Sequence, residues 1–188
     1  MQFEIDISNS SGHSDVDHEH LRTALVHALE VEGVTSAVLS VSLVNNPTIH
    51  QLNREHLNHD YPTDVISFQL DWNSPEHRAP PLSPEKRAVN ASIEGEIVVS
   101  VDYAASMAAE FGWSVQNELT LYAVHGMLHI CGYDDLTSGE KEIMRSRERA
   151  VLKGLGIKPG YPVDGKHAEE PPGTKTNDAI DGPVEGPQ

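Results

Sequence analysis

The chain has 188 residues, 38% of them hydrophobic, which is enough to build one domain with a sizeable core. Its 13 Lys and Arg residues stand against 29 Asp and Glu residues, and the formal charge of −16 argues against broad electrostatic binding to nucleic acid or to an anionic membrane. The single cysteine, Cys131, excludes a scaffold of intrachain disulfides, and the sequence shows neither a signal-peptide pattern nor an apolar run of about 18 residues. We therefore expect a protein of the reducing cytoplasm, with no membrane partner.

The hydrophobic pattern predicts four strands and five helices in the order βαβαββααα. Strands are expected over residues 2–8, 35–44, 64–70 and 93–101, and helices over residues 17–31, 46–57, 102–111, 115–131 and 138–153. Asn46 is expected to cap the second helix, with Pro47 in its first turn, and Thr137 with Glu140 resembles a capping box for the last helix. This order indicates an α+β single domain in which about five helices pack on a mixed four-stranded sheet.

Two segments fall outside this pattern. Residues 71–92 contain four prolines and mixed charge, and we expect a surface insertion there. Residues 158–188 hold six of the twelve prolines and very few bulky apolar side chains, so they cannot bury enough surface to offset the entropy of ordering. We expect them to form a disordered acidic tail, which leaves residues 1–157 as the folded domain.

The most informative stretch is HGMLHICGYDD, residues 125–135. His125 and His129 are four residues apart on a predicted buried helix, so both imidazoles project from one face and can converge on one metal ion. Gly132 is suited to end the helix in the left-handed conformation, after which the chain turns back. Asp135 would then complete a three-ligand site with one open position, which is the pattern of catalytic zinc, and Asp134 is the alternative ligand.

Less specific interpretations of these residues compete with a metal site. Two histidines four residues apart are more often core or surface side chains, and it is the added glycine and carboxylate that favour a metal site. Zinc proteases of the H-E-x-x-H type use the Glu as general base, and Gly126 occupies that position here, which disfavours a peptide hydrolase. Cys131 is expected to point away from the site as a small buried hydrophobe. The pattern therefore predicts a metal-dependent hydrolase that lacks the protease carboxylate.

The sequence resembles the YbeY family of bacterial endoribonucleases, or rRNA maturation factors, in three motifs. Residues 125–135 are similar to the family's H-G-x-L-H-x-x-G-Y-D-H. Residues 52–68, LNREHLNHDYPTDVISF, are similar to L-N-x-x-Y-R-x-x-D-x-P-T-D-V-L-S-F, and residues 94–100, EGEIVVS, to L-G-D-I-V-I-S. With the element order, the resemblance covers roughly residues 1–155.

This resemblance implies a single-strand-specific, metal-dependent endoribonuclease involved in 16S rRNA 3′ end processing, late-stage 30S maturation and ribosome quality control. It also implies a metzincin-like metal cleft beside the sheet, lined by the third and fourth strands. By motif position His125 and His129 are metal ligands, and Asp135 takes the place of the family's third histidine. The implied cofactor is one Zn²⁺ ion; Mn²⁺ or another divalent ion is the alternative, because a carboxylate is a harder ligand than an imidazole.

Three further positions bear on the activity. The family's functional arginine is replaced by Leu57, and Arg54, about one helical turn earlier, is the candidate substitute that could contact phosphate. Asp64 is a candidate orienting group, with a turn carboxylate that caps the strand start as the alternative. Glu94 stands where the family has Leu and is expected to add negative charge near the cleft.

The expected partner is single-stranded rRNA. Because the domain is acidic, recruitment by a 30S ribosomal protein or an assembly GTPase is expected to bring the protein to its substrate. The alternative function is a ribosome-assembly factor with a mainly structural metal and little nuclease activity, which the missing arginine favours. It predicts that removal of His129 unfolds the domain.

Overall fold

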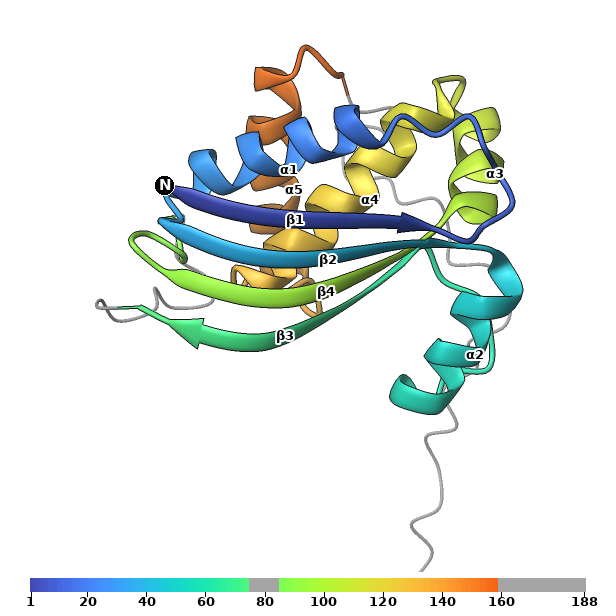
Figure 1. Ribbon diagram of the computed structural model, residues 1–188, viewed down its shortest axis with the longest axis horizontal. Helices are drawn as coiled ribbons and strands as arrows, with labels where there is room; N and C mark the ends of the chain where they lie inside the picture. Colours follow the sequence, from blue (N-terminus) through green and yellow to red (C-terminus); the bar gives the residue numbers. More distant parts are fainter. Residues whose placement is uncertain (75–84, 159–188) are drawn as a thin grey trace, which may run out of the picture.

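The structure is a computed structural model, and it describes residues 1–74 and 85–158. The elements follow the predicted βαβαββααα order: β1 (Gln2–Asn9), α1 (His18–Glu32), β2 (Ser36–Val44), α2 (Asn46–Leu57), β3 (Val65–Asn73), β4 (Ser92–Ser100), α3 (Val101–Phe111), α4 (Val115–Ile130) and α5 (Ser138–Gly154). The predicted α+β class, with a four-stranded mixed sheet and five helices, is confirmed (Figure 1).

The strands lie in the order β1-β2-β4-β3. β1 and β4 flank β2 in parallel, with Leu39 opposite both Ile5 and Gly95. β3 runs antiparallel to β4 at the edge of the sheet, where Val65 lies opposite Val99. This arrangement leaves β3 as the strand at one border, directly beside α4.

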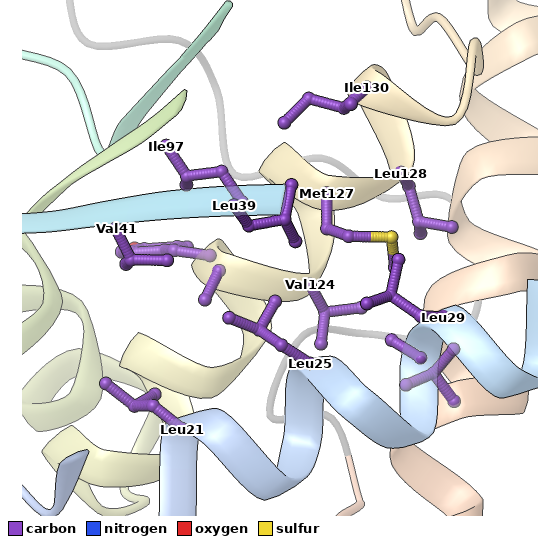
Figure 2. Close-up of a cluster of buried hydrophobic side chains, with 14 of the residues drawn as sticks. Leu21, Leu25, Leu29, Leu39, Val41, Ile97, Val124, Met127, Leu128 and Ile130 are labelled. Atoms are coloured by element: carbon purple, nitrogen blue, oxygen red, sulfur yellow. The ribbon is translucent and has the colours of Figure 1, made fainter. Parts of the chain in front are cut away.

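Helices α1, α3 and α4 pack against one face of the sheet, and α5 packs on α1 and α4 (Figure 1). Figure 2 shows apolar side chains from α1, β2, β4 and α4 meeting between the sheet and the helices. Leu25, Leu39 and Met127 are fully buried there. Burying one such side chain contributes roughly 1.5–3 kcal/mol, so the core is held together by apolar contacts. No helix in the described part of the chain is both long enough and apolar enough to cross a membrane.

The other face of the sheet is covered only in part. Ile49 of α2 packs there against Val44, Ile66 and Val98 in a second, smaller cluster. Farther along β4, Glu94 is exposed on this open face, because the neighbouring Gly95 faces α4, where a Cβ would lie 2.6 Å from Ile130 Cδ1. The expectation that Glu94 adds charge near the cleft is therefore wrong, since alternation along the strand directs it to the opposite side.

The helix ends follow the predicted capping chemistry with one shift. Thr137 and Glu140 form the predicted capping box at the start of α5. The N-cap of α2 is Asn45, whose side chain accepts from Thr48 N, so the assignment of Asn46 to the cap was wrong by one residue. Asn46 instead accepts from the Ser100 hydroxyl and joins the start of α2 to the end of β4.

The segment 71–92 differs from the expected surface insertion. Its first three residues continue β3 to Asn73, and residues 75–84 lie outside the described residues. Arg87, Ala88 and Ala91 are buried, so the surface prediction is wrong for them. The predicted tail also lies outside the described residues from residue 159 onward.

Candidate metal centre

Helix α4 places His125 and His129 one turn apart on one face, as the spacing predicts. Their rings stand nearly perpendicular, with an interplanar angle of 85° and centroids 4.6 Å apart. The two Nε2 atoms face each other at 3.0 Å. The same helix buries eleven other residues, so the pair is carried by a rigid element of the core.

The opposite ring nitrogens have partners that fix their protonation. His125 Nδ1 lies 2.7 Å from Glu148 Oε1, and His129 Nδ1 lies 3.0 Å from the carbonyl oxygen of Tyr133. A carboxylate and a carbonyl only accept hydrogen bonds, so each Nδ1 carries a hydrogen, which leaves each Nε2 to hold either the second proton of its ring or a metal ion. Two facing lone pairs at this distance require a shared proton or a cation between them. The residues present therefore fit a metal ion.

Asp135 is brought to the same point by the turn after α4. Gly132 adopts the predicted left-handed conformation with φ of 88°, and the chain reverses there. One carboxylate oxygen of Asp135 lies 3.9 Å from His125 Nε2 and the other lies 3.9 Å from His129 Nε2. Asp134 instead accepts a hydrogen bond from the backbone of Asp135 at 2.8 Å. Of the two carboxylates, Asp135 is the one placed as a third ligand.

The charges around the pair set which ring is neutral. Burial lowers the pKa of His125, but the hydrogen bond and charge of Glu148 outweigh burial and leave that pKa above its usual value. Burial raises the pKa of Glu148, yet His125 and then Arg145 bring it below the usual value, so the carboxylate is ionised. Burial and the charge of His125 both lower the pKa of His129. His129 thus presents an unprotonated Nε2, the form that binds metal.

The cluster is open to solvent on one side. The side chains of His125, His129 and Asp135 are 16%, 27% and 38% exposed. The three side chains could therefore hold a metal ion and leave one side of it open to a further ligand from solvent.

Packing explains why the H-E-x-x-H carboxylate is missing. Gly126 lies directly under the sheet, where a Cβ would stand 2.9 Å from Ile97 Cγ2 and 3.0 Å from Val65 Cγ2. Real Cβ atoms hardly ever approach so closely, and a glutamate side chain has no room there. The close contact between α4 and strands β3 and β4 thus excludes the protease base.

The other predicted residues occupy different places. Asp64 Oδ1 accepts from the backbone N of Val65 at 2.8 Å and from the Thr63 hydroxyl at 2.9 Å, which is the alternative strand-capping role. Its negative charge adds to the effect of Glu148 in raising the pKa of His125. Arg54 lies 4.0 Å from Asp60 on exposed α2, and no described contact links it to the histidines. The structure brings together His125, His129 and Asp135.

Sequence reasoning missed the residues that orient the ligands. Glu148 is fully buried on α5 between Met144 and Val151, and its second oxygen accepts from Arg145 Nη1 at 2.9 Å. A carboxylate on the apolar stripe of an otherwise charged helix was the available indication. The role of the Tyr133 carbonyl has no indication in the sequence, because any residue supplies that group.

The fold and this cluster define a single α+β domain built around a candidate metal centre of two imidazoles and one carboxylate. The family profile described as Endoribonuclease YbeY matches residues 6–156. The chain belongs to the YbeY endoribonuclease family.

Two relatives of that name agree with this membership. The chain is 37% identical to Endoribonuclease YbeY of Bacillus subtilis over 165 residues, covering 84% of this chain and 99% of the relative. It is 36% identical to the protein of that name from Salinibacter ruber over 149 residues, covering 74% and 90%. It is also similar to the solution structure of TM1509 from Thermotoga maritima, with a TM-score of 0.49, 22% identity and coverage of 87% and 99%.

Proposed function

We propose that this protein is a metal-dependent endoribonuclease that cleaves single-stranded RNA, with His125, His129 and Asp135 as the ligands of one Zn²⁺ ion. The observation that carries the proposal is the convergence of the two Nε2 atoms and the Asp135 carboxylate at a solvent-accessible point. Mn²⁺ is the alternative ion, since a carboxylate ligand favours harder metals more than a third imidazole would. Family membership supports the ribonuclease activity.

A bound ion at this position would polarise a phosphoryl oxygen and lower the pKa of a water molecule or a ribose hydroxyl. The protein's own residues prepare the site for it. Glu148 holds His125 and the Tyr133 carbonyl holds His129, so both Nε2 lone pairs point to the same place. Asp64 is the candidate for orienting the attacking group, because it stands directly before β3, the strand that packs beside α4. Arg54 is assigned no part, because its described partner is Asp60.

We place this activity in 16S rRNA 3′ end processing, late-stage 30S maturation and ribosome quality control in the cytoplasm. Membership in the family supports this role. The formal charge of −16 gives the protein little general attraction for RNA, so the proposal includes recruitment by a 30S ribosomal protein or an assembly GTPase.

The second candidate is an assembly factor with a mainly structural metal. Leu57, 46% exposed at the end of α2, favours it, because no guanidinium stands where the family has its arginine. The packing argues against it. The core between the sheet and the helices is closed by apolar side chains, and the proposed ligands lie at its margin rather than inside it. A metal at the margin is not needed to hold this core together.

The test is RNA cleavage by chelator-treated protein, with and without added Zn²⁺ or Mn²⁺, on single-stranded rRNA fragments. His129→Ala is the test variant, and His18→Ala, at the start of α1, is the matched control. We expect metal to restore cleavage in the wild type and in His18→Ala but not in His129→Ala, with all three proteins folded. If metal-loaded wild type leaves the RNA intact and His129→Ala unfolds, the assembly-factor role replaces this proposal. Cleavage that survives in His129→Ala would mean that the cluster is not the active site.

A further inference from the structure

Tyr133 connects the candidate metal centre to the interior of the domain. Its backbone carbonyl holds the His129 ring at 3.0 Å, and it stands two residues before Asp135. Its backbone N donates to Leu128 O at 3.1 Å, beside a bond of 2.8 Å from Gly132 N to His129 O. These two bonds end α4 in a Schellman-type turn. The position of Tyr133 therefore decides where two of the three proposed ligands lie.

The side chain of Tyr133 is anchored at its far end by Glu32, the last residue of α1. The phenol hydroxyl donates to Glu32 Oε2 at 2.6 Å, and the side chains of both residues are buried. The other oxygen of Glu32 accepts from Arg147 Nε at 2.9 Å and from Nη2 at 2.7 Å. The Glu32 carboxylate is held rigidly, because any movement would break several charge-assisted hydrogen bonds at once.

The ring of Tyr133 is held on its face by Arg87. The guanidinium carbon lies 4.6 Å from the ring centroid, and Arg87 Nη1 donates to Gly132 O at 2.7 Å. Arg87 thus binds both residues of the turn, one through the π face and one through the backbone. Nothing in this set touches the proposed metal position directly. These contacts act on the metal position indirectly. The Tyr133 carbonyl holds His129, and Asp135 follows Tyr133 by two residues.

We propose that Tyr133 is a positioning residue for the metal centre, and that the buried hydrogen bond from its hydroxyl to Glu32 and the stack of Arg87 on its ring fix the turn that orients His129 and Asp135. Groups that hydrogen-bond to a metal ligand typically change metal affinity by about 10–100-fold when they are removed, and the side chain of Tyr133 anchors one such group, its own carbonyl. This inference rests on the proposed metal centre. The inference adds that residues which are not ligands, on helices α1 and α5, determine how tightly the centre binds its metal.

The test variant is Tyr133→Phe, which removes only the hydroxyl and leaves Glu32 paired with Arg147. The matched control is Ser11→Ala, which also removes a buried hydroxyl. That hydroxyl donates to Asn9 Oδ1 at 2.7 Å, at the end of β1. β1 is the edge strand on the other side of the sheet from β3. Zinc affinity is measured for each protein by competition with a chromophoric chelator. The visible absorption spectrum of the cobalt-substituted protein reports ligand geometry, and the melting temperature of the metal-free protein reports stability.

We expect Tyr133→Phe to bind zinc about 10-fold or more weakly and to show an altered cobalt spectrum. Ser11→Ala should show wild-type affinity and spectrum despite a comparable loss of melting temperature. If metal-free Tyr133→Phe does not fold, Arg87→Lys, which keeps the charge but loses the planar stack, takes its place with the same expectation.

Zinc affinity and a cobalt spectrum equal to wild type in the folded variant would overturn the inference, as would an equal loss of affinity in Ser11→Ala. A wild-type protein that binds neither metal would instead overturn the proposed function, so the two failures are distinguishable.

Discussion

Glu148 Oε1 lies 2.7 Å from His125 Nδ1, although the two residues are 23 positions apart and belong to different helices. Glu148 is completely buried, and its other oxygen accepts from Arg145. The carboxylate therefore fixes the tautomer and the orientation of the histidine, and it ties α5 to α4 at the candidate metal centre.

The first prediction concerns this carboxylate. Glu148→Gln keeps an acceptor for His125 but removes the negative charge, so we expect about 10-fold weaker zinc binding and a lower melting temperature. Isothermal titration with zinc and thermal unfolding of the metal-free protein measure the two effects. Glu142→Gln, exposed on the same helix, should change neither. Undiminished zinc binding by Glu148→Gln would show that the orientation of His125 does not depend on this charge.

Gly126 gives a prediction about stability. In Gly126→Ala the new methyl group would meet Ile97 and Val65 at about 3 Å, so we expect a loss of about 1–3 kcal/mol in the free energy of unfolding despite the better helix propensity of alanine. Urea denaturation measures it.

The matched experiment for Gly126 is a double-mutant cycle. Val65→Ala removes one of the two crowding methyl groups, so Gly126→Ala should cost less in that background. A Gly126→Ala protein more stable than wild type would show that α4 is free to shift away from the sheet.

Asp135 gives a prediction about metal preference. Asp135→His replaces a carboxylate by an imidazole, which is the softer ligand, so the affinity for Zn²⁺ should rise relative to that for Mn²⁺. Competition between the two ions during loading, followed by elemental analysis, gives the ratio. Asp134→Asn keeps the acceptor for the Asp135 backbone and should leave the ratio as in wild type. An unchanged ratio in Asp135→His would remove Asp135 from the ligand set.

The pH dependence of stability is predicted for Glu118. Burial, which outweighs hydrogen bonds from Tyr122 and Trp113, raises the pKa of Glu118 above its ordinary value of 4.5. The folded protein then holds this proton more tightly than the unfolded chain does. Its contribution to stability is therefore complete below the unfolded pKa and is lost as the pH rises from there through the folded pKa.

Replacing Glu118 by glutamine removes that titration. The free energy of unfolding of Glu118→Gln, relative to wild type, should therefore increase as the pH rises through the weakly acidic range. Urea denaturation over that pH range measures the difference. Glu110→Gln, exposed on α3, is the control for the loss of one surface carboxylate. A difference between Glu118→Gln and wild type that does not change with pH would contradict the burial effect.

The sequence predicts those features that depend on local spacing. The pair His125 and His129, the left-handed turn at Gly132 and the capping box at Thr137 all arise from residues within one or two helical turns, and all three are present. The expected burial of Cys131 is confirmed as well. Local periodicity thus gives the element order and the two histidines of the candidate site.

Contacts between segments far apart in the sequence could not be predicted from local spacing. Glu148 and Glu32 lie on apolar stripes of their helices, beside Met144 and Leu29, where only the packing of α1, α4 and α5 shows what a carboxylate would pair with. The burial of Arg87 depends on the turn that it contacts, and that turn is 45 residues away in the sequence. Neither hydrophobic period nor residue type specifies such a pairing.

The position of His125 and His129 on a helix that is buried on its other sides has a consequence for metal exchange. In zinc fingers the ligands gather only when the metal folds the chain, so loss of the ion is loss of the fold. Here α4 is held by its apolar contacts, and the two imidazoles stay in place without help from the ion. For the proposed metal centre, this predicts that the domain loses and regains its ion while folded, so that the fraction of ion-loaded protein follows the concentration of the free ion.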